Sequence, residues 1–236
     1  MARVGLVGGL GPESTIDYYR RIIEAWQERR PGSAPSVIID SLDVDLGIRL
    51  VQDDRPGLVA YLLESIRRLE RAGADFVAIG ANTPHVVFDD VAARTDVPML
   101  SIVDACAAEA ARRGFQIVGL LGTRFTMEAS LYTDVFSRRS ITVVVPEEAD
   151  RSWLHDRYIG ELVRGVFRDE TREGVLALVR RLRERFGVEA IVYGGTELPL
   201  LLQGGSAEGL PTLDTTELHV RAIVEHLISL SSATAV

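Results

Sequence analysis

The pattern of apolar positions divides the chain into two alternating kinds of segment. Short runs rich in valine, isoleucine and leucine, such as Arg3–Gly8 and Asp75–Ile79, predict buried strands. Longer stretches with an apolar residue every three or four positions predict amphipathic helices, and one of them begins at Pro56 and ends at Gly73. Strands that alternate with helices indicate an α/β fold in which each sheet is mainly parallel and is flanked by helices.

Four of the predicted helices lead to specific expectations. The helix after the first strand and the helix from Pro56 should each bury one apolar stripe. A third helix is predicted over Trp153–Phe167. The last helix, Thr216–Leu230, is expected to pack against the first half of the chain and to be followed by a frayed tail, Ser231–Val236. The two predicted stripes are Ile16, Tyr19, Ile23 and Trp26 in the first of these helices, and Leu58, Leu62, Ile66 and Leu69 in the second.

The chain contains an internal repeat with a constant spacing. The first strand, Val4–Gly8, has a copy at Val118–Gly122, and 118 − 4 = 114. The glycines that end two other strands, Gly80 and Gly194, have the same separation, because 194 − 80 = 114. Two matches at one offset indicate a duplicated α/β unit and predict two pseudosymmetric lobes. We expect the first lobe to cover residues 1–102 and 207–236, and the second to cover residues 103–206.

Composition and charge narrow the possible partners. The 236 residues are 47% hydrophobic and 25% charged, which is typical of a globular protein, and the net charge is 26 − 34 = −8. An acidic chain without a basic stripe argues against nucleic acid and against an anionic membrane surface as partners. No apolar run reaches the roughly 18 residues of a membrane span. Because the first strand starts at once and there is one cysteine, we expect a cytoplasmic protein without a signal peptide.

The absence of lysine excludes two kinds of chemistry. All 26 basic residues are arginine, so neither the Schiff base that anchors pyridoxal phosphate nor a lysine-containing phosphate loop can form. The histidines show no metal-ligand spacing, so we expect no metal. We expect His85 to make a structural hydrogen bond and Cys106 to be a buried, inert thiol. The four histidines are His85, His155, His219 and His226.

The first strand-to-helix turn, Gly8–Ser14, allows three interpretations. It partly resembles a dinucleotide fingerprint, although Ser14 replaces the third glycine, and Asp40 at the end of the next strand supplies the acid of such sites. Alternatively, its glycines serve only the tight backbone geometry. In the third interpretation the turn is an anion site, in which backbone N–H groups such as that of Gly9 hold a carboxylate.

Small polar residues on the other turns are candidate ligand-binding groups. Asn82 and Thr83 follow one repeated strand, and Thr196 follows its copy. They could bind a carboxylate and an amine, or they could cap the local backbone. Thr126 precedes a predicted helix, so it could cap that helix or donate to an anion. All these turns follow carboxyl ends of strands, where parallel sheets bind ligands, so we expect the site in the cleft between the lobes.

Two arginines are candidates for binding a second carboxylate. Arg164 lies on the predicted helix Trp153–Phe167, and Arg49 lies on a segment after the second strand. A guanidinium group can form a bidentate ion pair with a carboxylate. The alternative for each is an ordinary solvated arginine on the surface.

Four motifs resemble, in order, those of the aspartate/glutamate racemase family. They are Val4–Thr15, Asn82–His85, Gly122–Met127 and Gly194–Glu197, and they span nearly the whole chain. The resemblance implies two pseudosymmetric α/β lobes, a homodimer, no pyridoxal phosphate or other cofactor, and a small acidic amino acid or dicarboxylate as ligand. The ligand-binding residues that it implies are Asn82, Thr83, Thr126, Thr196 and Arg164, with Arg49 as a looser match.

The resemblance also implies a mechanism with two cysteines on opposite faces of the substrate α-carbon. One thiolate removes the α-proton, and the opposing thiol delivers a proton to the other face. Here the two positions hold Ala81 and Gly195, and their separation, 195 − 81 = 114, makes them equivalent in the repeat. Neither side chain can carry a proton. Some relatives keep one cysteine, whereas this chain keeps neither.

Two explanations of this departure stay open. Either a cysteine has been removed from the natural sequence, with Gly195 as the more suspicious position, or the chain is a natural divergent member. Three functions follow: an amino-acid racemase of the aspartate/glutamate type, impaired or inactive in this sequence; a decarboxylase-like carbanion enzyme, with Glu197, Tyr193 or His85 as its acid; or a non-catalytic protein that binds dicarboxylates. A nucleotide-binding role ranks last.

Overall fold

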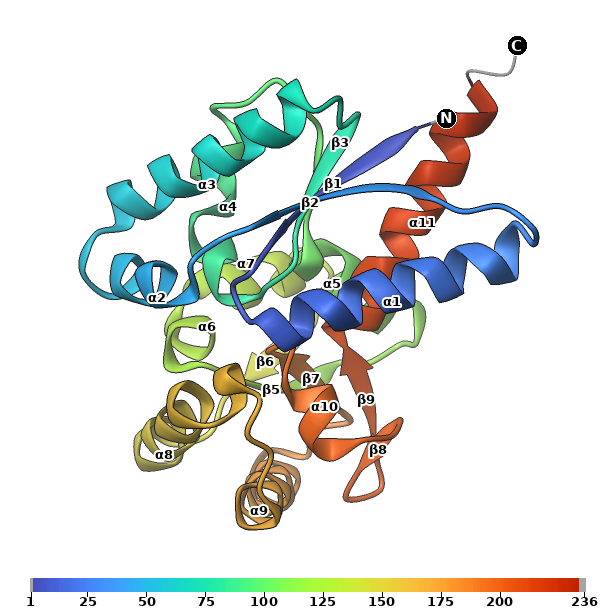
Figure 1. Cartoon of the computed structure of the whole chain (residues 1–236). Coiled ribbons are helices and arrows are strands. Elements are labelled where there is room, and N and C mark those ends of the chain that lie inside the picture. The colour runs from blue at the N-terminus through green and yellow to red at the C-terminus, as the bar shows by residue number, and fades with distance from the viewer. Residues whose placement is uncertain (1, 234–236) are drawn as a thin grey trace. The chain divides into compact units, whose positions relative to one another are not determined.

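A computed structural model describes residues 2–233, which form two compact units (Figure 1). The first unit holds the residues up to Ile102 and those from Thr216 on, and the second holds Val103–Thr215. Each contains a mainly parallel sheet flanked by helices, as the alternation of strands and helices predicts. None of the helices in this described part is long and apolar enough to cross a membrane.

The first sheet has four parallel strands in the order β2-β1-β3-β4. β1 lies between two neighbours, and its Val4 is paired with Val37 of β2 and with Phe76 of β3. A central parallel strand is covered on both faces, which is why β1 is apolar and buried from Val4 to Gly8. The four strands are β1 (Arg3–Gly8), β2 (Ser36–Ser41), β3 (Phe76–Ile79) and β4 (Met99–Leu100).

The last helix of the chain belongs to the first unit, as predicted. His226 of this helix packs edge-on against Phe76 of β3, with 4.6 Å between the ring centroids. The helix continues through Ala233, so the prediction of a frayed tail is wrong for residues 231–233, and residues 234–236 lie outside the described residues. The helices of this unit are α1 (Pro12–Arg29), α2 (Val44–Asp53), α3 (Arg55–Arg71), η1 (Thr83–Val87), α4 (Phe88–Ala92) and α11 (Thr215–Ala233).

The predicted buried stripe is correct for α3 and partly wrong for α1. All four predicted positions of α3 are buried in the apolar core of the unit. In α1, however, Ile16 and Tyr19 are 53% and 47% exposed, and the buried apolar side chains are Tyr18, Ile22 and Trp26. Both stripes satisfy the helical periodicity, so spacing could not separate them. The observed stripe gives the buried Tyr18 hydroxyl a hydrogen-bond partner within the same unit.

The second sheet repeats the order of the first, as β6-β5-β7-β9, with β8 added in antiparallel orientation beside β9. The starts of β1 and β5 are separated by 117 − 3 = 114 residues, and those of β3 and β7 by 190 − 76 = 114. β9 pairs with β7, and residues 207–215, which we expected in the first lobe, belong to the second unit. The strands are β5 (Ile117–Gly122), β6 (Thr142–Val144), β7 (Ala190–Gly194), β8 (Ser206–Ala207) and β9 (Leu210–Asp214).

Two predicted helices of the second half are each interrupted. The helix predicted over Trp153–Phe167 ends at Gly160, a short 3₁₀ turn follows, and the next helix begins at Asp169. The helix predicted from Met127 is split by the extended backbone of Ala129. The observed helices are α5 (Ile102–Arg112), α6 (Arg124–Glu128), α7 (Ser130–Ser137), α8 (Glu148–Gly160), η2 (Leu162–Arg164), α9 (Asp169–Phe186) and α10 (Leu198–Leu202).

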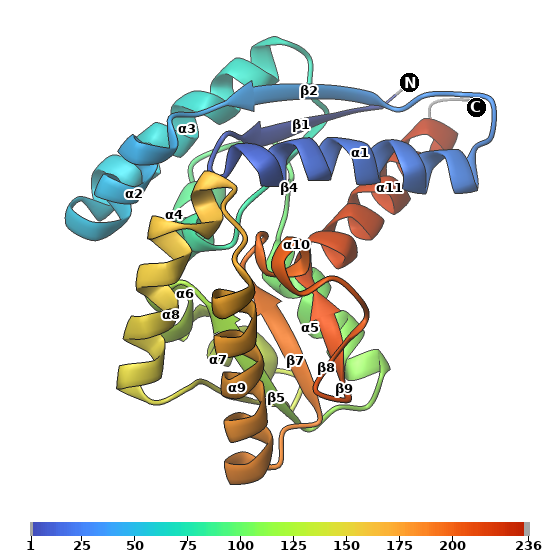
Figure 2. The ribbon, with the colours of Figure 1, turned by 60° about the horizontal axis from the view of Figure 1, so that its bottom comes forward.

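Helices α8 and α9 lie side by side in the second unit (Figure 2). Trp153 of α8 packs against Gly174 of α9 so closely that a Cβ atom at position 174 would lie 2.5 Å from Cζ2 of the indole. A larger residue at position 174 would therefore push the two helices apart. This contact holds α8 close to α9. Tyr158 of α8 then reaches Glu197, in the turn that follows β7.

The corrected stripe of α1 can be tested with one pair of substitutions. Ile22 is fully buried, so Ile22→Ala is expected to lower the free energy of unfolding by about 2–5 kcal/mol. Ile16→Ala in the same helix is the matched control and should change it by less than about 0.5 kcal/mol. Denaturant titration of both variants measures the difference, and equal costs would contradict the observed orientation of α1.

Candidate functional site

The turn after β3 places a small buried segment at the carboxyl end of the first sheet. Ala81 and Asn82 are buried, and Thr83, the first residue of η1, is half-buried. The Asn82 side chain makes no capping hydrogen bond to η1, so local capping does not explain this residue. The turn holds three of the predicted site residues next to one another.

Two buried histidines support this turn. The imidazole Nδ1 of His85 lies 2.8 Å from the Ala81 carbonyl oxygen, and the backbone N–H of Ile102 donates to Nε2 at 3.3 Å. Because Nε2 accepts, the proton must be on Nδ1, which donates to Ala81. In the same way the Tyr18 hydroxyl donates to Nδ1 of His219 at 3.0 Å, and Nε2 of His219 donates to the Leu100 carbonyl at 3.1 Å. The structural hydrogen bond predicted for His85 is confirmed.

Both imidazoles are neutral because they are buried. Burial lowers the pKa of His85 to about 4, with the hydrogen bond to Ala81 acting in the opposite direction. Burial also lowers the pKa of His219 to about 3, and the neighbouring His85 adds to this effect. The two rings meet edge-on with 6.3 Å between their centroids. The pair therefore fixes the carbonyl group of the turn without carrying charge.

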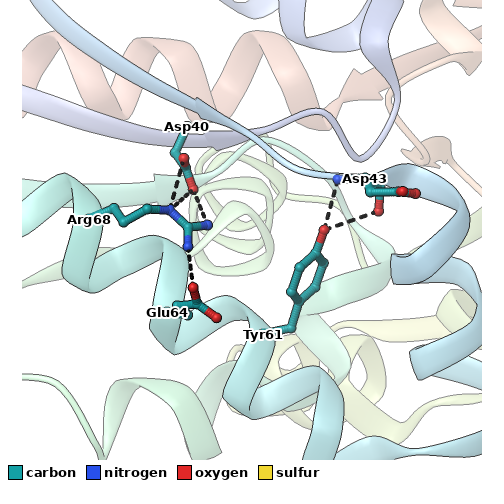
Figure 3. Close-up of polar contacts among 5 residues, drawn as sticks. All are labelled: Asp40, Asp43, Tyr61, Glu64 and Arg68. Carbon is teal, nitrogen blue, oxygen red and sulfur yellow. Dashed lines mark hydrogen bonds and ion pairs between the residues drawn. The ribbon is translucent and has the colours of Figure 1, made fainter.

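The turn after β1 is occupied by contacts within the first unit. Gly9 has φ 81°, a conformation that favours glycine, and its N–H donates to the Thr15 hydroxyl at 2.8 Å. Asp40 receives the Arg68 guanidinium in a bidentate pair, with Nε 3.2 Å from both carboxylate oxygens and Nη2 2.8 Å from Oδ2 (Figure 3). Burial raises the pKa of Asp40, but the Arg68 contacts prevail and hold it below its usual value. Asp40, the acid that a dinucleotide site would need, is therefore bound in an ion pair with Arg68.

The turn after β7 contains a buried hydrogen-bonded carboxylate. Glu197 is 3% exposed, and Tyr158, which comes from α8, is 1% exposed. The Tyr158 hydroxyl donates to Oε2 of Glu197 at 2.7 Å and accepts the backbone N–H of Glu197 at 3.2 Å. The Thr196 hydroxyl donates to the same Oε2 atom at 3.1 Å. A tyrosine, a threonine and a glutamate therefore form one compact cluster at the carboxyl end of the second sheet.

Gly195 lies directly against the Tyr158 ring. A Cβ atom at position 195 would overlap the Tyr158 hydroxyl oxygen and would lie 2.5 Å from Cζ and 2.8 Å from Cε2. The backbone of Gly195 does not have a positive φ, so its conformation does not require glycine. Glycine is required because the phenol fills the space that a side chain would need. A cysteine does not fit at this position while Tyr158 stays in place.

Thr126 lies beside the same turn, but it is not the residue that caps the helix. Thr123 is the N-cap of α6, and its hydroxyl accepts the N–H of Thr126 at 3.3 Å. The two threonine hydroxyls are 3.2 Å apart and buried. A Cβ atom on Gly194 would lie 3.2 Å from the Cγ2 of Thr126, so this side chain borders the turn after β7.

The two arginines predicted to bind a carboxylate are both exposed. Arg49 lies on α2, and Arg164 ends η2. The chain before Arg164 is anchored by Glu161, which accepts from the Thr171 hydroxyl at 2.6 Å and pairs with Arg157 at 2.7 Å. These two contacts lower the pKa of Glu161. The anchor explains why the predicted helix does not continue through Arg164.

Sequence reasoning missed Tyr158. In the sequence of α8 this tyrosine looks like any other buried apolar position. The only related feature in the sequence is the glycine at position 195, and a glycine alone does not identify the side chain that packs against it. The buried thiol was predicted correctly, because Cys106 is fully buried and burial raises its pKa. Across residues 2–233, no group of three or more histidine, cysteine or carboxylate side chains is arranged to hold a metal ion.

The comparisons with known proteins agree with this geometry. A sequence model described as Asp/Glu/Hydantoin racemase matches residues 7–223. The broad specificity amino-acid racemase RacX of Bacillus subtilis (strain 168) is 23% identical over 236 residues, which is 97% of this chain and 100% of that protein. The solved structure of a putative Asp/Glu racemase from Yersinia pestis is 31% identical with a TM-score of 0.85, and that of an aspartate racemase homologue from Pyrococcus horikoshii OT3 is 36% identical with a TM-score of 0.80. Both alignments cover 97% of this chain and 100% of the chain in the solved structure.

The duplicated parallel sheets give this chain the same fold as the solved structures of these racemase relatives. The chain belongs to the Asp/Glu/Hydantoin racemase family, whose pattern covers most of its length.

The neutral histidines predict that the protein loses stability in mild acid. Each folded-state pKa lies below that of the same group in the unfolded chain, so the unfolded state binds more protons and stability falls as pH drops below about 6.5. Denaturant titration should show a free energy of unfolding that is lower at pH 4.5 than at pH 7 by roughly 2–5 kcal/mol. His219→Gln keeps a donor for Leu100 and should reduce this loss. An undiminished loss in His219→Gln would contradict the assignment.

The contact between Gly195 and Tyr158 predicts a coupled pair of substitutions. Gly195→Ala should lower the free energy of unfolding by about 1–3 kcal/mol, because the added methyl group overlaps the phenol. Gly160→Ala, at an open position of α8, is the matched control and should cost less than about 0.5 kcal/mol. In the double variant Gly195→Ala/Tyr158→Ala the cost of the first substitution should largely disappear. Additive costs across this double-mutant cycle would show that the two positions do not share space.

Proposed function

We propose that the protein binds a small acidic amino acid or dicarboxylate through its strand-end turns, as a racemase-type protein that cannot use two thiols. Family membership supports the class of chemistry, which acts at the α-carbon of an amino acid. Asn82 and Thr83 in the first unit and Thr126 and Thr196 in the second are the proposed ligand-binding residues. We assign no proton transfer to Ala81, because a methyl group has no exchangeable proton.

The environment of Gly195 is the observation that carries this proposal. The Tyr158 ring fills the space beside this residue, and the phenol is held there by two hydrogen bonds to Glu197. A site from which a thiol had simply been deleted would be expected to leave a small cavity. The filled space therefore supports a natural divergent member of the family over a sequence from which a cysteine was removed.

The proposal has further parts that follow from the resemblance to the family. We propose that the protein works without pyridoxal phosphate or another cofactor, as a cytoplasmic homodimer. The missing lysine supports the first part, because no side chain is present that could anchor pyridoxal phosphate as a Schiff base. Arg164, with Arg49 as a weaker candidate, is proposed to meet the second carboxylate of the ligand.

A decarboxylase-like reaction is the second candidate function, and one observation favours it. Racemisation by the two-base route needs a proton-carrying group on each face of the α-carbon, whereas protonation of a carbanion after loss of carbon dioxide needs only one. The turn after β7 offers one such group in the Tyr158–Glu197 pair, while position 81 offers none. Substituted malonates therefore belong in the ligand panel.

Binding and racemisation can be measured separately. Thermal unfolding with L- and D-aspartate, L- and D-glutamate and methylmalonate should show at least one ligand that stabilises the protein, by about 2.7 kcal/mol at a hundredfold excess over its Kd. Asn82→Ala and Thr196→Val should weaken this stabilisation, and Thr133→Ala on the surface of α7 should not. Chiral chromatography should detect no racemisation at the rate of a two-thiol enzyme. A panel without any stabilising ligand would refute the binding proposal.

A further inference from the structure

We propose that the Tyr158 hydroxyl, working with Glu197, is the group that exchanges a proton with the α-carbon of the bound ligand, in place of a side chain at position 195. This inference rests on the proposed function, because it needs an acidic ligand with an α-carbon at the turn after β7.

The position of the hydroxyl supports this assignment. The turn Gly194–Glu197 lies at the carboxyl end of β7, a parallel strand with parallel neighbours on both sides, and such ends are where α/β sheets bind their ligands. A side chain at position 195 would start where the phenol oxygen of Tyr158 now lies. Tyr158 reaches this point from α8 rather than from the turn itself. The oxygen therefore occupies the space of a side chain at position 195 although it comes from a different element.

The hydrogen bonds around the hydroxyl give it a direction. The backbone N–H of Glu197 donates to the phenol oxygen, so the phenolic proton is left to point at Oε2 of the Glu197 carboxylate, 2.7 Å away. The Thr196 hydroxyl donates to the same Oε2 atom. Both hydroxyl groups donate to this one oxygen, so Oε2 of Glu197 is the proton acceptor in this short chain. The arrangement is that of a general base acting through a hydroxyl.

The proton transfer balances without charge on the phenol. As the α-carbon gives its proton to the Tyr158 oxygen, the phenolic proton passes to Oε2 of Glu197, which leaves a carbanion, a neutral tyrosine and a neutral glutamic acid. The reverse step returns a proton from Glu197 through Tyr158 to the carbon. A relay of this kind avoids a free phenolate, which burial and the Glu197 charge disfavour by raising the pKa of Tyr158 well above its usual value.

The first unit offers no matching group at position 81. The Ala81 side chain is a methyl group, and the nearby His85 uses both ring nitrogens for backbone partners, with Nδ1 bound to the Ala81 carbonyl and Nε2 to the Ile102 N–H. One proton-carrying group acts on one face of a carbanion. The ligand should therefore exchange its α-proton with solvent while its configuration is retained.

Proton NMR in deuterated water, combined with chiral chromatography, tests this inference. The full chain is incubated with each aspartate and glutamate enantiomer that stabilises it, and the loss of the α-proton signal is followed. Wild-type protein should exchange the α-proton without inverting it. Tyr158→Phe keeps the ring and should slow exchange at least about 100-fold, with a Kd within about threefold of wild type. Glu197→Gln should slow exchange to a similar extent and serves as the second variant if Tyr158→Phe does not fold.

Tyr61→Phe is the matched control. Its hydroxyl also accepts a backbone N–H, that of Asp43 at 2.8 Å, but it lies in the first unit beside α2 (Figure 3). This variant should exchange at the wild-type rate. Exchange at that rate in Tyr158→Phe, or racemisation in step with exchange, would overturn the inference. Binding without any exchange in the wild type would overturn it and leave the proposed function standing, whereas the absence of any binding would remove both.

Discussion

The second sheet depends on strand ends that approach each other so closely that no side chain fits between them. A Cβ atom on Gly194 would lie 2.5 Å from Cδ1 of Leu120, and one on Gly122 would overlap the carbonyl group of Gly194. Because glycine has no side chain, the backbone can turn sharply directly after the strand. The polar residues that follow the glycine therefore lie at the carboxyl end of the sheet. The buried Thr196 and Glu197 are placed in this way in the second unit.

The two copies of the repeat hold their turns by different means. In the first unit a neutral imidazole, His85, bonds to the carbonyl oxygen of Ala81 and is itself fixed by a backbone N–H. In the second unit the phenol of Tyr158 bonds to both the carboxylate and the N–H of Glu197. In the first unit the neutral imidazole only supports the backbone. In the second unit a hydroxyl group lies beside a carboxylate that can accept its proton. A duplicated scaffold has thus kept its backbone plan while its two ends acquired different chemistry.

Much of the fold could be predicted from the sequence, because both the strand periodicity and the 114-residue repeat can be read directly from the order of residues. The stripe of α3 was predicted correctly since only one apolar face exists there, whereas α1 offers two overlapping stripes and the contact of Tyr18 with His219 decides between them. The turns that carry Asn82 and Thr196 were visible as copies of one motif. Tyr158 was not, because its role comes from a contact with Gly195, 37 residues along the chain (195 − 158 = 37), and no spacing rule encodes that contact.

The filled space beside Gly195 also constrains how this lineage can change. Placing a thiol at that position requires two substitutions, and either order passes through a disfavoured intermediate. If cysteine arrives first, it collides with the aromatic ring; if the ring leaves first, it opens a void and strips Glu197 of its partner. The two positions can therefore change only together, so the contact between the glycine and the ring resists any single substitution.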